Sequence, residues 1–200
     1  MRYGIVGTSW ITESFIAGAA LAGGMELAAV YSRSAQRAEA FAQKHGAALT
    51  FTSLEEMATC AAIDAVYIAS PNVFHAPQSR LFLEHDKHVL CEKPMALNAR
   101  EAAEMQAAAE RAGKLLMIGF VRRFGNDCFT AQDFLDTGYC GEIYYAKAVY
   151  QRRNGNPGGW FGDKSRSGGG PLIDLGVHVI DLVRFLMGNP QPVSAYGAAF

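Results

Sequence analysis

Residues 3–12 read Tyr-Gly-Ile-Val-Gly-Thr-Ser-Trp-Ile-Thr, a short apolar run that meets a glycine and then a helical pattern. In the dinucleotide-binding fingerprint three glycines follow the first strand. They permit a tight turn, the close approach of a pyrophosphate, and close packing of the helix. Only the first of them, Gly7, is present here, because Ser9 and Thr12 hold the other two positions. The motif is therefore compatible with a nucleotide site or with a plain strand–turn–helix.

The residues of this turn are candidates for contact with a phosphate. Helix N-terminal amides favour anions, and the Ser9 hydroxyl adds a donor of its own. Thr12 either widens the packing of helix on strand or caps the helix. We expect a nucleotide cofactor to be bound here by Gly7, Thr8, Ser9, Trp10 and Ile11.

The first 120 residues continue as an alternation of short apolar runs with longer helical patterns. Several runs are apolar throughout, which is typical of strands buried on both faces of a parallel sheet. Helix starts are indicated by Ser34, Ser53 and Asn98, and helix ends by Gly46 and Gly113. The pattern predicts an α/β fold with a doubly wound parallel Rossmann sheet, whose strands lie at 3–6, 27–31, 48–51, 65–69, 88–91 and 114–119.

The pattern changes after Gly119, which predicts a dinucleotide-binding domain over residues 1–121 and the beginning of an α/β substrate domain over 122–200. In the second part we predict helices over 126–136 and 172–187, and a long strand over 142–151. A loop rich in Gly and Pro spans 154–170, and residues 192–200 are expected to start another strand.

Composition and charge exclude several classes of protein. The 200 residues contain 18 Lys and Arg against 19 Asp and Glu, so the net charge of -1 argues against a nucleic-acid partner. The chain lacks an apolar run of the ~20 residues that span a bilayer. The four cysteines have no C-x-x-C spacing, so we expect reduced thiols in the cytoplasm, with neither a zinc site nor a disulfide scaffold.

The end of the second strand bears on the choice of cofactor. NAD-preferring sites usually place Asp or Glu there, on the ribose 2′-hydroxyl. This chain has Ser32 and Arg33, followed by Ser34. A guanidinium with neighbouring hydroxyls suits a 2′-phosphate, so we expect NADP to be preferred, with NAD possible. The alternative is that Arg33 is simply a solvated side chain.

Two groups of residues are candidates for the chemistry. The fifth strand ends in Cys91-Glu92-Lys93-Pro94, at the sheet edge where ligands bind in such folds, and Pro94 restricts the backbone of Lys93. The run 168–181 carries Asp174 and His178 four residues apart on one helix face. The alternatives for that pair are a stabilising helical contact or a metal half-site with Asp181; we predict no metal.

The ordered set of motifs resembles the Gfo/Idh/MocA oxidoreductases, the glucose-fructose oxidoreductase and inositol dehydrogenase family. The resemblance rests on the opening glycine turn, on residues 69–72 with His75, on 92–94, on 123–124, on 141–143 and on 168–181. It implies that Lys93 is the catalytic lysine, Asp174 the substrate-orienting acid and His178 the acid/base histidine. It also implies cofactor contacts at Ser70, Pro71, Asn72, His75 and Glu92, and substrate contacts at Lys93, Arg123, Asp174 and His178.

The implied function is NAD(P)-dependent hydride transfer with a polyol, a sugar or a related hydroxyl or ketone substrate. The resemblance implies a homo-oligomer assembled through the C-terminal domain, and no membrane partner. Members of the family continue well past this length, so we expect a fragment or shortened chain, with residues beyond 123 stable only when covered. The alternative function is a nucleotide-binding module without turnover.

Overall fold

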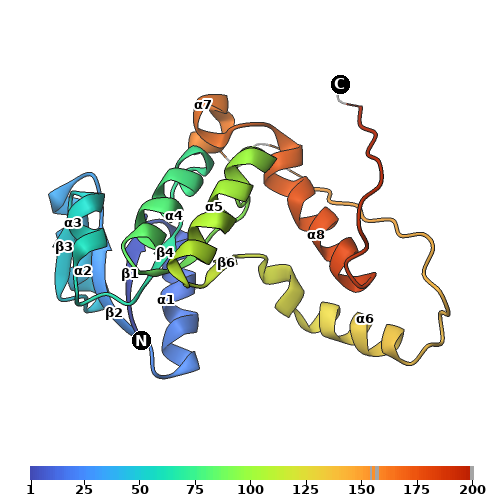
Figure 1. Cartoon of the computed structure of the whole chain (residues 1–200), viewed down its shortest axis with the longest axis horizontal. Coiled ribbons are helices and arrows are strands. Elements are labelled where there is room, and N and C mark those ends of the chain that lie inside the picture. Colours follow the sequence, from blue (N-terminus) through green and yellow to red (C-terminus); the bar gives the residue numbers. More distant parts are fainter. Residues whose placement is uncertain (154, 156–157, 199–200) are drawn as a thin grey trace.

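A six-stranded parallel sheet forms the first half of the chain in a computed structural model that describes residues 1–153, 155 and 158–198 (Figure 1). The strand order is β3-β2-β1-β4-β5-β6, so the topology reverses between β1 and β4. This confirms the predicted doubly wound α/β fold. The strands are β1 (Arg2–Val6), β2 (Glu26–Tyr31), β3 (Leu49–Phe51), β4 (Ala65–Ile68), β5 (His88–Cys91) and β6 (Leu116–Ile118).

Alternate residues of the strands face two separate cores, because side chains of a strand point to opposite faces of the sheet. One core packs β1, β2 and β4 against α1 (Trp10–Ala22) and α2 (Ala35–His45). The other core packs the sheet against α3 (Leu54–Thr59), α4 (His75–Glu84) and α5 (Ala99–Ala112). Burial on both faces explains why these strands are apolar throughout.

Helix ends in this half form where the sequence predicts them. The Ser34 and Ser53 hydroxyls accept hydrogen bonds from the amides three residues later, and so does the Asn98 side chain. Gly46 and Gly113 end α2 and α5 in the left-handed conformation. These local contacts fix where each helix begins and ends, and therefore where each strand end is exposed to a ligand.

The second half contains helices but no strand among the residues that the structure describes. Residues 142–151 are extended without a ladder, and the side chain of Tyr144 is 93% exposed, so the predicted strand is wrong. The strand predicted to start at 192 does not form over 193–198 either, while residues 199–200 lie outside the described ones. A strand requires a partner for its backbone groups, and no described segment provides one here.

The helices of this half are short apart from two. The predicted helix over 126–136 is confirmed as α6, and the helix over 172–187 begins as a π-helical turn. Within the loop predicted over 154–170 lie two helical turns, while 154, 156 and 157 fall outside the described residues. The elements of this half are η2 (Val121–Phe124), α6 (Asn126–Asp136), η3 (Gly159–Gly162), α7 (Lys164–Ser167), η4 (Leu172–Gly176) and α8 (Val177–Leu186), while η1 (Asn72–Phe74) lies in the first half between β4 and α4.

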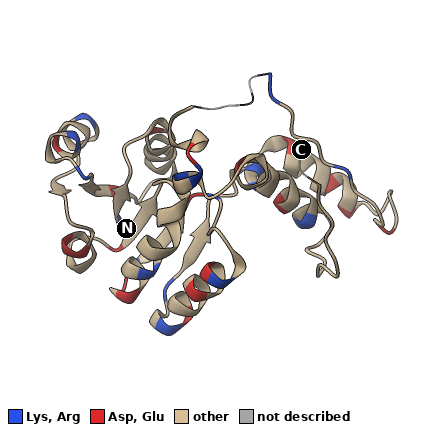
Figure 2. Cartoon of the chain, turned by 90° about the horizontal axis from the view of Figure 1, so that it is seen from above, with Lys and Arg blue, Asp and Glu red and all other residues tan. Residues whose placement is uncertain are grey.

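The two halves meet at the carboxyl ends of the strands. The side-chain amide of Asn72, after β4, donates to the carbonyl of Ser167 in α7 at 2.8 Å. α7 contacts η1, at the start of α4, while α8 and α6 extend beyond β6 (Figure 1). Basic and acidic residues are interspersed along the ribbon (Figure 2). Among the helices of the described residues none is long and apolar enough to cross a membrane.

Candidate active site

The turn after β1 is built in a way that only glycine permits. Gly7 has φ +110°, and a Cβ there would lie 2.6 Å from the carbonyl oxygen of Ala69 at the end of β4. Two neighbouring strand ends therefore approach as backbone against backbone. The turn lies beside the reversal of strand order, which is where open α/β sheets bind nucleotides.

Thr12 does not cap the helix, because Ser9 is the N-cap residue of α1. Its side chain is fully buried, and its hydroxyl donates to the carbonyl of Gly7 at 3.0 Å. This bond joins the first turn of α1 to the end of β1. At the third fingerprint position the chain therefore has a threonine that hydrogen-bonds the strand end, where the fingerprint has a glycine. Ser9 is the N-cap residue, yet its hydroxyl caps no helix amide within the described chain. Trp10 is 74% exposed at the same helix end.

The end of β2 presents hydroxyls and a guanidinium to solvent. The Ser32 hydroxyl accepts a hydrogen bond from the amide of Ser34 at 3.3 Å, and the Ser32 amide donates to the carbonyl of Phe51 at 3.1 Å. Arg33 is exposed, and no described carboxylate forms an ion pair with it. Its charge is thus uncompensated at the place where a ribose phosphate would lie.

The polar residues after β4 are buried and bonded within the protein. The Ser70 hydroxyl donates to Gln78 at 2.7 Å, and Asn72 holds Ser167. The ring of His75 has Nδ1 2.7 Å from the carbonyl of Pro94 and Nε2 2.9 Å from the carbonyl of Ser70. Burial lowers the pKa of His75. The side chains of Ser70, Asn72 and His75 therefore brace the strand end, and Pro71 precedes η1.

Glu92 follows β5 and lies at an apolar cavity. The Tyr67 hydroxyl donates to its carboxylate at 2.8 Å, and burial raises the pKa of Glu92. A Cβ on Gly119 would lie 3.1 Å from the same carboxylate. The cavity measures about 300 Å³, and Ile11 of the first turn also lines it, together with Ser14, Phe15, Tyr67, Leu90, Met117, Ile118, Gly119, Phe120, Val121 and Phe124.

Lys93 and Asp174, which are 81 residues apart in the chain, are brought together as an ion pair. Lys93 Nζ donates to Asp174 Oδ1 at 3.0 Å and to the backbone carbonyl of Asp174 at 3.0 Å. The two side chains are only 16% and 18% exposed. The pair joins the end of β5 to η4, so it connects the nucleotide-binding sheet with the second half of the chain.

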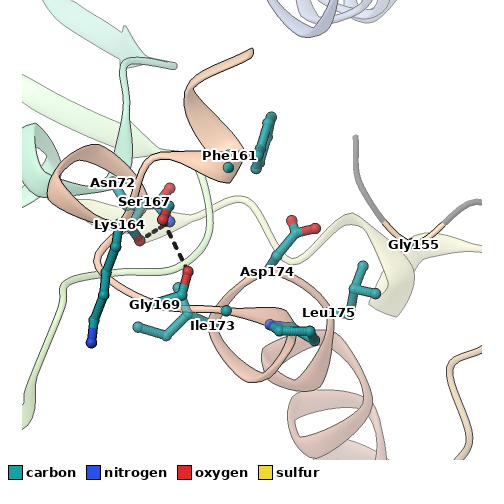
Figure 3. A pocket seen from close by; sticks show the side chains of 12 residues that line it. Asn72, Gly155, Phe161, Lys164, Ser167, Gly169, Ile173, Asp174 and Leu175 are labelled. Atoms are coloured by element: carbon teal, nitrogen blue, oxygen red, sulfur yellow. Dashed lines mark hydrogen bonds between the residues drawn. The ribbon is translucent and has the colours of Figure 1, made fainter. Parts of the chain in front are cut away.

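Asp174 points toward a cavity of about 330 Å³ between the two halves (Figure 3). Phe161 and Leu175 lie around it in the same view, and Asn72 joins Ser167 at its far side. The π-helical turn before α8 places Asp174 at the start of that helix. Most of the wall comes from the glycine-rich segment, and the lining residues are Asn72, Gly155, Phe161, Gly162, Lys164, Ser167, Gly169, Gly170, Pro171, Ile173, Asp174 and Leu175.

His178 lies in the first turn of α8, close to the same group of charges. Burial, followed by the charges of Lys93 and Arg122, lowers the pKa of His178 to about 4, although Asp174 and Asp181 oppose the shift. Its Nδ1 is buried without a hydrogen-bond partner among the described residues. Asp174 bonds Lys93 and not His178 in the part of the chain described. The imidazole is therefore neutral at neutral pH and able to accept a proton.

Arg123 contacts one carboxylate and two aromatic rings of the protein. Its guanidinium forms a two-pronged ion pair with Asp181 of α8 and lies over the rings of Phe120 and Phe185, 5.6 Å and 5.1 Å from their centroids. This arrangement fixes η2 against α8. It also occupies Asp181, which the metal half-site would have required as a ligand.

Three further residues lie at the site that sequence reasoning missed: Arg122, Tyr150 and Arg152. The Tyr150 ring stacks on His178 with centroids 6.4 Å apart. Arg152 donates to the Tyr150 hydroxyl at 3.5 Å and approaches Asp174 Oδ2 at 3.7 Å. Hydrogen bonds from Arg152 and Arg122 lower the pKa of Tyr150. Tyr150 and Arg152 belong to the segment predicted as a strand or its edge, and no spacing marked them.

Comparison with known proteins identifies relatives over the whole chain. The family model "Oxidoreductase family, NAD-binding Rossmann fold" matches residues 1–120, and "GFO/IDH/MocA C-terminal domain" matches 129–200. The chain is 40% identical, over its full length, to 62% of scyllo-inositol 2-dehydrogenase (NADP(+)) from Bacillus subtilis (strain 168). It is 37% identical, over 88% of its length, to half (50%) of D-glucoside 3-dehydrogenase from Escherichia coli (strain K12).

A solved structure shows the same fold. The NAD-binding protein from Listeria innocua superimposes with a TM-score of 0.83 at 31% identity, over 92% of this chain and 54% of that one. The chain thus spans between 50% and 62% of the length of these curated relatives.

Proposed function

The chain belongs to the Gfo/Idh/MocA oxidoreductase family, as its motifs predicted, and from this premise we propose that it transfers a hydride between a nicotinamide cofactor and a polyol or sugar. Residues 1–121 would bind the nucleotide, and 122–200 would supply one side of the substrate site. The observation that carries the proposal is the meeting of Lys93, Asp174 and His178 at the carboxyl edge of the sheet.

The turn around Gly7 fits a dinucleotide. The absent Cβ leaves backbone groups open to a pyrophosphate, and the Ser9 hydroxyl and the helix amides are suited to hold it. We propose contacts from Gly7, Thr8 and Ser9 to the phosphates, and packing of Trp10 and Ile11 beside them. Glu92 and the backbone near Pro71 are proposed to face the nicotinamide side.

NADP is the proposed preferred cofactor, with NAD as the second choice. Arg33 is exposed beside Ser32 and carries a charge that no described acid neutralises. A guanidinium binds a phosphate through two parallel hydrogen bonds. The B. subtilis relative is named for NADP(+) as well.

The chemistry assigned to this chain is proton transfer and charge stabilisation. When bound, the cofactor supplies the hydride acceptor or donor. His178 is neutral near pH 7 because its pKa lies at about 4, so it accepts the hydroxyl proton in the oxidation direction. Lys93 donates a hydrogen bond to the same oxygen and stabilises the negative charge that develops there. Asp174 holds Lys93 in place at 3.0 Å. In the reverse direction Lys93 serves as the acid, or His178 does so once it has taken up a proton.

We also propose how the chain assembles and where it is located. Tyr144 and Tyr145 are 93% and 71% exposed in the second half, which favours a homo-oligomer through residues 122–200. All four cysteines are free thiols, which is typical of cytoplasmic proteins.

The proposal is tested by comparing Lys93→Met with the wild-type chain. Fluorescence titration with NADPH and NADH measures cofactor binding, and formation of reduced cofactor with a panel of polyols and sugars measures turnover. We expect Lys93→Met to lower turnover about a hundredfold or more while cofactor affinity changes little. Lys114→Met is the matched control, because Lys114 forms only a long ion pair with Asp86 at 3.9 Å.

The same assays contain the result that contradicts the proposal. Cofactor binding without turnover on any substrate would indicate a nucleotide-binding module. Near-full turnover by Lys93→Met would show that the lysine is wrongly assigned.

A further inference from the structure

We propose that the substrate carries an anionic group, a carboxylate or a phosphate, and that Arg122 and Arg152 bind it at the mouth of the site. This inference rests on the proposed function, because it names the class of polyol or sugar that the same site accepts. It departs from the named substrates of the relatives reported above, scyllo-inositol and a D-glucoside, which carry no charge.

The charges around His178 do not balance. Four cations gather there, and two of them have a carboxylate of their own: Lys93 pairs with Asp174, and Arg123 pairs with Asp181. Glu92 is turned to the hydroxyl of Tyr67, and burial raises its pKa. The positive charge of Arg122 and Arg152 therefore remains largely uncompensated.

The two arginines have little acidic contact. Arg152 reaches Asp174 only at 3.7 Å, on a carboxylate already bonded to Lys93. Arg122 forms no ion pair with any described residue. A guanidinium presents several donors in a planar fork that matches the two oxygens of a carboxylate or phosphate. These donors are available to a ligand.

Tyr150 holds the two arginines beside the reacting groups. Arg152 donates to its hydroxyl and lies 5.3 Å from its ring centroid, and the ring itself stacks on His178. The charge of Arg122 acts on the same two side chains, since it lowers the pKa of both Tyr150 and His178. Positive charge therefore lies both at the mouth of the site, on Arg122 and Arg152, and near His178, the proposed proton acceptor. An anionic group bound to Arg152 would lie beside the Tyr150 ring, which stacks on His178.

The substrate class that follows is a sugar or polyol with an acidic substituent. A hydroxyl at one carbon would meet His178 and Lys93, while the acidic group meets the arginines. Uronates, aldonates and sugar phosphates all satisfy this requirement. Both guanidinium groups are exposed, so a neutral sugar leaves their charges to water, whereas an acidic substituent adds charge-assisted hydrogen bonds.

Calorimetric titration of the full chain, in the presence of NADPH, tests the inference without requiring turnover. The ligands are D-glucuronate, D-glucose, D-glucosamine and the phosphate ester of glucose. We expect D-glucuronate to bind at least about tenfold more tightly than D-glucose, and D-glucosamine to bind most weakly. Added salt should weaken the binding of glucuronate and leave that of glucose unchanged.

Variants identify the residues. Arg122→Met and Arg152→Met should each reduce the preference for glucuronate, and the double variant should abolish it while glucose binding persists as a sign of an intact site. Arg153→Met is the matched control, since Arg153 is the neighbouring residue, carries the same charge and is exposed. It should keep the preference.

Three results would overturn the inference: equal affinity for glucuronate and glucose, an undiminished preference in the double variant, or no saturable binding of glucuronate. Tighter binding of the phosphate ester than of glucuronate would support it and identify the group as phosphate. Failure of the proposed function is separate, because it would appear as a lack of hydride transfer while the ligand preference remained.

Discussion

Replacing Gly7 with Ala adds a single atom, a Cβ, and tests both the turn after β1 and the packing of β1 against β4. The new Cβ would lie 2.6 Å from the carbonyl oxygen of Ala69, whereas ordinary contacts begin at 3.4 Å. One of the two strand ends must therefore move by about 0.8 Å. The backbone of Gly7 also has φ +110°, which residues with a Cβ rarely adopt.

The expected cost combines these two effects. Backbone strain of this kind costs of order 1–3 kcal/mol, and forcing an atom into a packed site typically costs a further 1–3 kcal/mol. We therefore expect Gly7→Ala to lower the free energy of unfolding by about 2–6 kcal/mol. It should also weaken NADPH binding strongly, because the displaced backbone no longer faces the pyrophosphate.

Gly18→Ala is the matched control. Gly18 lies within α1, a Cβ there has no heavy atom within 4 Å, and its φ is not positive. Alanine at that position should stabilise the chain by about 0.5–1 kcal/mol. Urea denaturation and NADPH fluorescence titration on both variants give the comparison. Equal stability of the two variants, or unchanged NADPH affinity in Gly7→Ala, would refute the reasoning.

Three further predictions concern His178, Arg123 and Arg33. The pKa of His178 falls from 6.5 to about 4 on folding, so the unfolded chain binds more protons in that range and stability is lost as the pH falls through it. Since the side chain is partly exposed, we expect His178→Phe to recover about 1–2 kcal/mol of the free energy of unfolding that is lost at low pH. Equal pH dependence of urea denaturation in the variant and the wild type would contradict this. Arg123→Met leaves the largely buried Asp181 without a cation, and should cost about 2–4 kcal/mol. Adding Asp181→Asn should recover part of that cost in a double-mutant cycle, and additive losses would rule out the pairing. Arg33→Gln should weaken NADPH binding about tenfold and leave NADH binding unchanged; an equal loss for both would remove the argument for NADP.

The Rossmann half was predictable because its information is local. Apolar runs, capping residues such as Ser34 and Asn98, and glycines such as Gly113 act within a few residues of where they stand. Each predicted strand lies within two residues of the observed one. Because the strands are apolar on both faces, helices must cover both sides of the sheet, as they do in the doubly wound fold.

The second half was less predictable because a strand depends on a partner far away in the sequence. Residues 142–151 have the composition of a strand, yet the described chain offers them no neighbour. The turn before α8 shows the same limit, since neighbouring contacts determine that residues 172–176 wind as a π-helix.

The catalytic candidates were found from motifs, whereas their electrostatic surroundings were not. The motifs marked Lys93 and Asp174 separately, and their ion pair became visible only in the structure. The hydrogen bond from the Thr12 hydroxyl to Gly7 likewise required coordinates to recognise. Tyr150 and Arg152 had no motif to mark them. Their role depends on distances across the fold, which a linear spacing does not contain.

A double-mutant cycle on kcat/KM with Lys93→Met and His178→Gln tests most directly whether these residues form one catalytic site. Groups that act together on one substrate oxygen give losses that do not add. We therefore predict that the double variant is about as slow as the slower single variant, while NADPH binding is retained in all three. Losses that multiply independently, or an unaffected His178→Gln variant, would contradict a shared site for hydride transfer.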